Sequence, residues 1–91
     1  MNTEEFMKRD HFASLLGIEL CVAENGTARA RLEIDEKHLN GLNMAHGGAI
    51  FTLADLVFAA ASNSYDSVAV GIHADIYFLK SVRKGTVLTG E

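Results

Sequence analysis

The sequence is short of cysteine and of positive charge, and it contains no proline. Its single cysteine, Cys21, cannot close an internal disulfide, so a disulfide-bonded scaffold is excluded and a reducing compartment is favoured. Eight Lys and Arg stand against twelve Asp and Glu, and the formal net charge is −4. This balance argues against nucleic acid as the main partner, because phosphate binding needs clustered Lys and Arg.

No part of the chain has the pattern of a secretion signal or a membrane span. The first ten residues are polar and lack an apolar core, unlike a signal peptide. The weakly polar stretch over residues 45–61 is interrupted by Thr52 and Asp55 and is slightly short for a membrane-crossing helix. We therefore expect a cytoplasmic protein without a membrane partner.

The length and apolar content predict a single small domain, residues 1–91, that packs against another chain. A chain of 91 residues makes at most one domain, which buries only about 60–65% of its unfolded surface. Apolar residues nevertheless account for 48% of the sequence. That share is more than a small monomer needs and indicates burial against a partner.

Periodicity along the chain predicts a mixture of helices and antiparallel strands. The expected order is a short helix over residues 10–17, strands over 18–22 and 27–34 joined by a tight Asn25-Gly26 turn, a loop over 35–45, a helix over 46–62, and strands over 68–79 and from 86 onward. An apolar stripe of the long helix is expected from Ile50, Leu53, Ala54, Val57, Phe58 and Ala61. The chain stops just after its last strand begins, so we expect a fragment, or an unusually short version, of a larger domain.

Residues 46–55 carry the strongest functional signal. Gly47 and Gly48 at the helix start predict free backbone N–H groups at the positive end of the helix dipole, and Asp55 follows two turns later. Amide donors and a carboxylate are the minimum needed to attack an acyl carbonyl, and thioester hydrolysis is the first chemistry to test. The glycines could equally form a tight turn, and Asp55 could be an ordinary boundary aspartate.

The spacing of Gly47 and Asp55 predicts a site shared between chains. Eight residues on one helix separate two groups by roughly 12 Å along the axis, whereas both must lie within about 3–3.5 Å of the reacting atoms. If both act, they come from different chains and the protein is at least a dimer. Asp55 should also flank the buried face beside Phe51 and Phe58, where a carboxylate loses hydration and becomes a better base or nucleophile.

Asn40 and the basic residues near the end of the chain allow a structural and a functional explanation. Asn40 either forms a loop turn or orients the substrate carbonyl. Lys80, Arg83 and Lys84, here called the basic cluster, form either a solvated turn or a dock for the phosphates of a nucleotide-bearing carrier.

The remaining histidines and the cysteine give weaker signals. His73 and Asp75 resemble a metal-ligand pair, but no convincing third ligand is present, so we expect no metal. Cys21 is expected to be a small buried residue rather than a nucleophile. His11 and His38 show no pattern that indicates a role.

The stretch from residue 38 to residue 55, H-L-N-G-L-N-M-A-H-G-G-A-I-F-T-L-A-D, resembles the signature of the hotdog-fold acyl-CoA thioesterases, in the phenylacetate-degradation (PaaI-type) branch. Segments 12–19 and 77–80 also resemble that family. The resemblance implies an α+β hotdog fold, an antiparallel sheet wrapped around a long central helix, in dimers or tetramers with the active site at the dimer interface. The family's last one or two strands are missing, and Ser81 and Thr86 depart from its usual proline and acidic residue.

The resemblance also implies roles for particular residues. Asn40 would orient the thioester carbonyl, Gly47 would supply the oxyanion N–H with His46 beside it, and Asp55 would come from the partner chain. The substrate would be a coenzyme A thioester of an aryl-acetyl, benzoyl or medium-chain acyl group, so no separate cofactor is expected. We further expect it to be bound by Gly48, Phe51 and the basic cluster.

Two other functions are compatible with the sequence. A hotdog hydratase or dehydratase would use His46 and Asp55 on the carbons beside the carbonyl, although the sequences usual around such pairs are absent. A non-enzymatic acyl-CoA sensor, or an inactive remnant, would bind the thioester without turnover. The sequence also leaves open whether Asp55 acts as nucleophile or general base.

Overall fold

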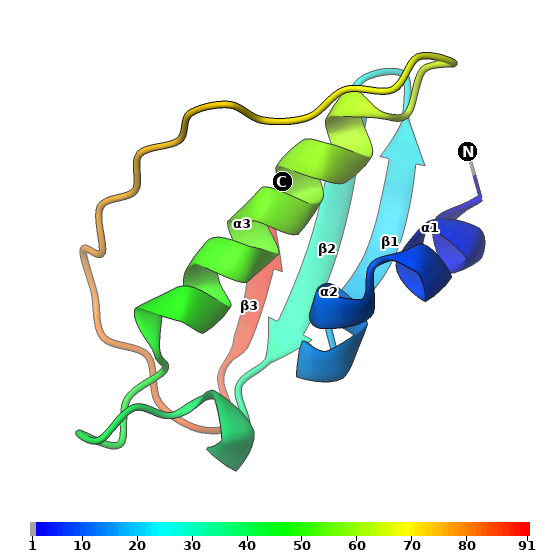
Figure 1. Cartoon of the computed structure of the whole chain (residues 1–91). Coiled ribbons are helices and arrows are strands. Elements are labelled where there is room, and N and C mark those ends of the chain that lie inside the picture. Colours follow the sequence, from blue (N-terminus) through cyan, green and yellow to red (C-terminus); the bar gives the residue numbers. More distant parts are fainter. Residues whose placement is uncertain (1) are drawn as a thin grey trace.

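The computed structural model describes residues 2–91, which form an antiparallel sheet packed against a long helix (Figure 1). The elements along the chain are α1 (Thr3–Arg9), α2 (His11–Leu16), β1 (Glu19–Glu24), β2 (Thr27–Glu33), a 3-10 turn (Glu36–His38), α3 (Gly47–Ser62) and β3 (Val87–Gly90). Among these residues the sheet has three strands in the order β1-β2-β3, which confirms the expected α+β architecture. None of the helices within residues 2–91 is both long and apolar enough to cross a membrane.

Local capping sets the two N-terminal helices. Asn2 begins α1, because its side-chain oxygen accepts two N–H groups of the first turn at 2.9 and 3.2 Å. Asp10 caps α2 in the same way through the Ala13 N–H at 3.0 Å, and Gly17 ends that helix with a φ of 81°. The predicted helix with its Gly17 stop is therefore confirmed, whereas α1 was not predicted.

The hairpin predicted from Asn25-Gly26 connects β1 and β2. Both turn residues have positive φ, 51° and 79°, as a two-residue hairpin with the right twist requires. The inward positions on and after β2 are buried as predicted: Ala28, Ala30, Leu32 and Ile34. The strand predicted from residue 86 is β3, which pairs antiparallel with β2 on its other side.

A bulge at Cys21 changes which β1 residues face the core. Between Leu20 and Val22, β1 advances by two residues while its partner strand advances by one, so Cys21 is the extra residue. As a result Ala23 is buried, Val22 is only half-buried and Cys21 is exposed. The predicted burial of Cys21 is therefore wrong.

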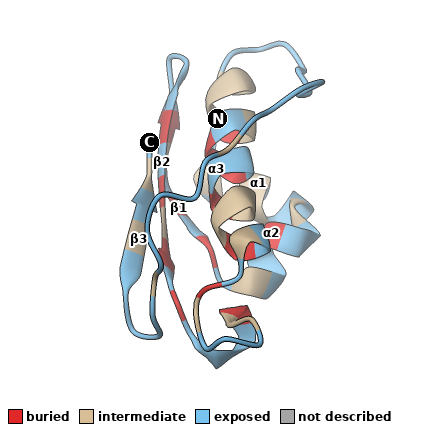
Figure 2. Ribbon diagram, turned by 90° about the vertical axis from the view of Figure 1, so that its left-hand side faces the viewer, coloured by how far each residue is buried: buried red, intermediate tan, exposed pale blue. Residues whose placement is uncertain are grey.

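The side of α3 that packs on the sheet matches the predicted stripe only in part, at Leu53 and Val57. Its buried residues are Ala49, Leu53, Leu56, Val57 and Ala60. Ala54 is exposed instead, and Phe58 keeps 48% of its surface exposed. Apolar residues lie on almost every side of this helix, so periodicity alone cannot identify the buried side. Figure 2 shows the buried residues gathered where the sheet and α3 face each other.

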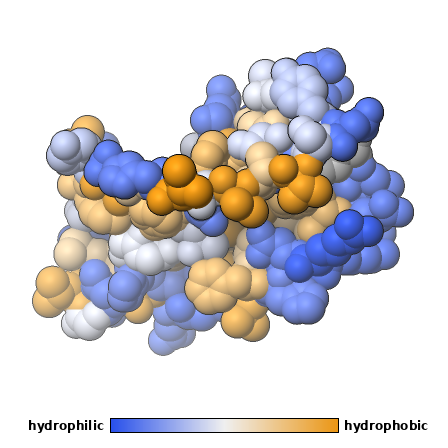
Figure 3. All heavy atoms as spheres, turned by 45° about the horizontal axis from the view of Figure 1, so that its top comes forward, coloured by the Kyte–Doolittle hydropathy of each residue, from blue (hydrophilic) through white to orange (hydrophobic). Residues whose placement is uncertain are grey.

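Residues 68–79 do not form the predicted strand. They belong to an irregular stretch, residues 63–86, that leaves the end of α3, swings past it and returns to β3 (Figure 1). Val68, Val70, Ile72 and Leu79 are 81–97% exposed, and Figure 3 shows hydrophobic residues in a row on the molecular surface. An alternating pattern becomes a strand only beside another strand, and none within residues 2–91 pairs with this stretch. We call residues 68–80 the outer segment.

Candidate functional site

The first turn of α3 contains a backbone N–H that has no partner among residues 2–91. His46 caps the helix, because its Nδ1 accepts the Gly48 N–H at 2.9 Å and its carbonyl oxygen accepts the Ala49 N–H at 2.9 Å. The Gly47 N–H donates to no atom of residues 2–91. It stands free at the positive end of a 16-residue helix, where negative charge on an oxygen is stabilised.

The cap also fixes the tautomer of His46. A ring nitrogen that accepts a hydrogen bond carries no proton, so the hydrogen-bond pattern assigns the proton of the neutral imidazole to Nε2. His46 is exposed, and its Nε2–H is therefore a second donor on the residue next to Gly47. Sequence reasoning placed His46 beside the oxyanion donor but missed its role as the helix cap.

Close packing, rather than backbone conformation, explains the glycine pair. Neither Gly47 nor Gly48 has a positive φ, so a tight left-handed turn is not what requires glycine here. A Cβ atom on Gly47 would lie 3.1 Å from the Phe78 ring, and one on Gly48 would lie 3.1 Å from His46 Nδ1. Phe78 of the outer segment thus lies directly against Gly47.

Asn40 forms a turn and keeps its amide NH2 group free. Its Oδ1 accepts the N–H groups of Leu42 at 2.8 Å and Met44 at 3.2 Å. Its Nδ2 donates to none of the residues that the structure describes. The two explanations of Asn40 are therefore compatible, because the turn uses the oxygen and leaves two donors for a substrate carbonyl.

Two distant parts of the chain hold the residues just before α3. The Ala45 N–H donates to the Val82 carbonyl oxygen, and the His46 N–H donates to the His38 carbonyl oxygen, both at 2.7 Å. The basic cluster flanks Val82, is exposed and forms no ion pair within residues 2–91. The Ala45–Val82 bond therefore places the cluster next to the start of α3.

His38 anchors this loop to the N-terminal helices. It is 3% exposed, and its Nδ1 accepts the Asp35 N–H at 2.8 Å. Its Nε2 lies 2.7 Å from the Leu16 carbonyl oxygen and, with Nδ1 occupied as an acceptor, donates to it. Sequence reasoning missed His38, because Leu16 is 22 residues away along the chain.

Asp55 lies on the outer side of α3 and is exposed. It lines a groove of about 470 Å³ between α3 and residues 69–74, together with Phe58 and His73. The predicted loss of hydration is therefore not produced by this chain alone, because the buried side of α3 is rotated away from Asp55. Gly47 and Asp55 occupy one continuous helix, about 12 Å apart along its axis, so a single chain does not bring them together.

An apolar recess of about 520 Å³ lies beside His46. Gly48 and Phe51, both predicted to bind substrate, line it together with His46, and its other walls come from α2 and residues 37–39. Asp55 is not among its lining residues, and His46 does not line the groove that contains Asp55. Four predicted site residues are thus divided between two hollows, and the other five, Asn40, Gly47 and the basic cluster, line neither.

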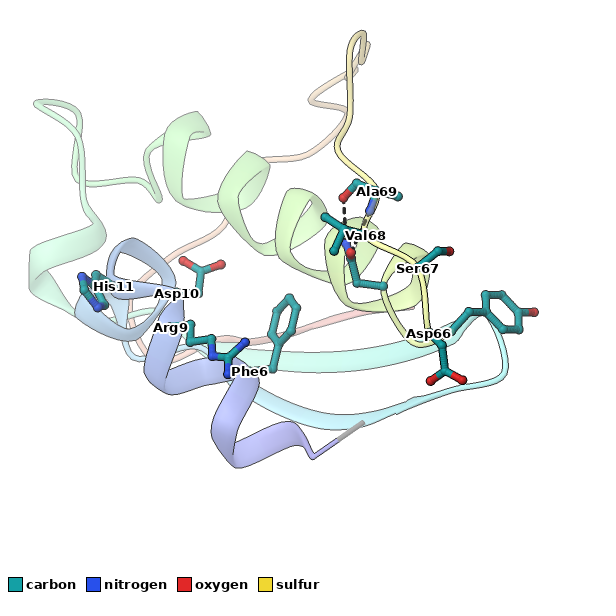
Figure 4. Close-up of a pocket in the computed structure, with 10 residues that line it drawn as sticks. Phe6, Arg9, Asp10, His11, Asp66, Ser67, Val68 and Ala69 are labelled. Atoms are coloured by element: carbon teal, nitrogen blue, oxygen red, sulfur yellow. Dashed lines mark hydrogen bonds between the residues drawn. The ribbon is translucent and has the colours of Figure 1, made fainter.

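Two further features lie away from the start of α3. His73 Nε2 and Asp75 Oδ2 are 3.3 Å apart and exposed, and within residues 2–91 no three potential metal ligands lie together. An open pocket of about 650 Å³ lies between α1 and residues 63–69 at the other end of α3, with Arg9 and Asp66 in its lining (Figure 4). It contains none of the predicted site residues.

Comparison with known proteins gives a consistent result. A family model described as "Thioesterase superfamily" matches residues 42–91. Acyl-coenzyme A thioesterase PaaI of Escherichia coli is 35% identical over 88 residues, which are 97% of this chain and 63% of that protein. A curated protein of Archaeoglobus fulgidus is 38% identical over 84 residues, which are 92% of this chain and 54% of that protein.

Solved structures agree with the sequence comparison. The E. coli PaaI protein from the phenylacetic acid degradation operon matches with a TM-score of 0.90 at 35% identity, covering 97% of this chain and 64% of that one. A Streptococcus mutans protein bound to acetyl CoA matches with a TM-score of 0.74 at 35% identity, covering 79% and 58%. The chain therefore spans between 54% and 64% of the length of these relatives.

Proposed function

Because the chain belongs to the thioesterase superfamily and has its hotdog fold, we propose that it hydrolyses coenzyme A thioesters. The observation that carries the proposal is the free Gly47 N–H at the start of α3. The relatives support it, since E. coli PaaI is described as an acyl-coenzyme A thioesterase and the S. mutans structure holds acetyl CoA. The proposed substrates carry an aryl-acetyl or medium-chain acyl group.

The proposed reaction starts with polarisation of the thioester carbonyl. The Gly47 N–H and the Asn40 Nδ2–H donate to the carbonyl oxygen, and both bonds strengthen as that oxygen becomes negative. Asp55 either attacks the carbonyl carbon or accepts a proton from the water that attacks it. If Asp55 attacks, the C–S bond breaks to leave an anhydride between the acyl group and Asp55, and water then hydrolyses it to the acid and the free carboxylate. If water attacks, its oxygen adds directly to the acyl group as the C–S bond breaks. In both cases the coenzyme A thiolate leaves and takes up a proton.

The Asp55 that acts at each Gly47 is proposed to belong to a second copy of the chain, in a homodimer or tetramer. Helix geometry supports this, because it holds the two groups about 12 Å apart in one copy. The exposed Asp55 and the exposed apolar residues of the outer segment leave surface for such an interface. A monomer that cleaves thioesters at the full rate in sedimentation and activity measurements would exclude the shared site.

The basic cluster is proposed to hold the phosphates of coenzyme A. Its three cations are exposed and form no ion pair within the described residues. The Ala45–Val82 hydrogen bond places them beside the start of α3. Phosphate docking there would align the thioester with Gly47.

Hydrolysis of a panel of acyl-CoA thioesters by wild type, Asp55→Ala and Asp55→Asn tests the proposal. We expect both substitutions to lower kcat by about 10²–10⁴-fold, because each removes the reacting carboxylate. The control Asp66→Asn, at an exposed aspartate near the other end of α3, should keep the wild-type rate. Unchanged turnover in Asp55→Ala would exclude the mechanism. Binding without turnover would favour a sensor, and hydration of crotonyl-CoA would favour a hydratase.

A further inference from the structure

We propose that the apolar recess beside His46 holds the acyl group of the substrate, and that Phe12 in its wall determines which acyl groups are accepted. The proposal rests on the thioester hydrolysis proposed above and adds the location of the acyl chain. The recess has a volume of about 520 Å³. Small-molecule pockets typically measure about 300–1,000 Å³, so the recess has room for an acyl chain.

The recess begins at the turn that would hold the thioester carbonyl. His46 and Gly48 line it, and they are the two chain neighbours of Gly47, whose N–H is free. Phe51, one helical turn further along α3, continues the same wall. A carbonyl that accepts the Gly47 N–H therefore has the recess within a few bonds of its carbon atom.

Most polar side chains that line the recess already have partners within the chain. Both ring nitrogens of the buried His38 are bonded to backbone groups. The Thr52 hydroxyl donates to the Gly48 carbonyl oxygen at 2.6 Å, and His46 Nδ1 accepts the Gly48 N–H. The recess therefore offers an acyl group mainly apolar contact, and the His46 Nε2–H and the Lys37 ammonium are the side-chain donors in its lining that have no partner among the described residues.

The lining of the recess carries little charge, which suits an uncharged acyl group. No Asp or Glu is among the described residues that line it. Lys37 lines it, but its ammonium nitrogen lies 3.7 Å from the position of a Cβ atom on Gly17, a residue outside the recess. An acyl chain that ends in a carboxylate would lose hydration in the recess, a cost that only a contact with the Lys37 ammonium or the His46 Nε2–H could offset.

Phe12 is the wall residue best suited to select among acyl groups. It projects from α2 and is 62% exposed, so little of its ring is used by the protein core. Phe12 and Phe51 reach the recess from different helices and give it aromatic walls from which an acyl chain displaces water. Leu15 lies on the same helix, is 71% exposed and does not line the recess, so it provides a matched control.

Steady-state kinetics with acetyl-, hexanoyl- and glutaryl-CoA test the proposal. Wild type should prefer hexanoyl-CoA to glutaryl-CoA, a chain of similar length with a terminal carboxylate, by at least about 10-fold in kcat/KM. Phe12→Ala should lower kcat/KM for hexanoyl-CoA by about 10-fold and leave acetyl-CoA within about 2-fold, because the acetyl methyl does not reach the wall. Phe12→Leu, which keeps an apolar wall, and Leu15→Ala should both retain the wild-type preference.

A binding measurement separates this proposal from the catalytic one. Calorimetric titration with S-hexyl-CoA, a thioether that cannot be hydrolysed, should be weakened about 10-fold by Phe12→Ala, whereas titration with free coenzyme A should not change. Equal effects of Phe12→Ala and Leu15→Ala on both compounds would overturn the recess as the acyl site, even if Asp55→Ala abolished hydrolysis. A Phe12-dependent affinity for S-hexyl-CoA without any thioester hydrolysis would retain the acyl site and overturn only the catalytic proposal.

Discussion

The two sides of α3 differ in burial and in chemistry. The side against the sheet consists of small and aliphatic residues that are at most 6% exposed: Ala49, Leu53, Leu56, Val57 and Ala60. The outer side carries Gly47, Phe51, Asp55 and Phe58, which are half-buried or exposed. Changes on the first side should therefore lower stability, and changes on the second should lower activity while the chain stays folded.

The largest expected effect on stability is that of Leu56→Ala on the sheet side. Leu56 is 1% exposed, so the substitution should lower the free energy of unfolding by about 2–5 kcal/mol through lost burial and a new cavity. Urea unfolding measures this difference. Phe58→Ala removes a larger side chain from the outer side and should lower the free energy of unfolding less. An equal decrease in Phe58→Ala and Leu56→Ala would contradict the difference between the two sides of α3.

His38→Ala should have the next largest effect, because His38 joins the core to the loop that carries Asn40 and His46. The substitution leaves the Asp35 N–H and the Leu16 carbonyl without their partner. We therefore expect the free energy of unfolding to fall by about 1–3 kcal/mol. Thermal unfolding tests this value. His11→Ala is the control, because His11 is exposed and should change stability by less than about 0.5 kcal/mol.

Gly47→Ala should lower kcat/KM by about 10-fold with little change in stability, because the new methyl group displaces Phe78 or the helix start. In a Phe78→Ala background the same substitution should lower kcat/KM by a smaller factor, because the ring that crowds the new methyl group is absent. Kinetics of the four variants in this cycle measure the coupling. Gly41→Ala is a matched control, as a Cβ atom there meets nothing within 4 Å.

The smallest expected effect is that of a single cation in the basic cluster. Lys84→Ala should raise KM for an acyl-CoA about 2–3-fold at low ionic strength and leave kcat unchanged, because an exposed charge contributes little and is screened by salt. As the salt concentration is raised, the KM of Lys84→Ala should converge with that of wild type. Lys8→Ala, on α1, should show no salt-dependent difference from wild type.

Features set by neighbours in sequence were predictable. The Asn25-Gly26 turn needs two consecutive residues that accept positive φ, and Gly17 ends α2 for the same reason. The span of α3 followed from the glycine pair and the apolar run. Spacing and family resemblance also singled out Gly47, whose N–H is free among the described residues.

Features set by distant partners were not predictable. Residues 68–79 have the alternation of a strand, but alternation does not supply the neighbouring strand. The bulge at Cys21 was hidden because apolar residues occupy both sides of β1. The pairing of Asp55 with Gly47 from another copy stays a prediction, since spacing excludes a single-chain site without locating the second chain.

The hydrogen bond from Ala45 to Val82 has a mechanical consequence. It spans 37 positions of sequence yet ends one residue before the helix cap, and the chain next to Val82 carries Arg83 and Lys84. If a nucleotide bound to those cations displaced them, the Ala45–Val82 hydrogen bond would transmit the displacement to the start of α3, two residues from the N–H group proposed to bind the carbonyl oxygen. Binding at the nucleotide end of a substrate would then adjust the position of the Gly47 N–H at its thioester end.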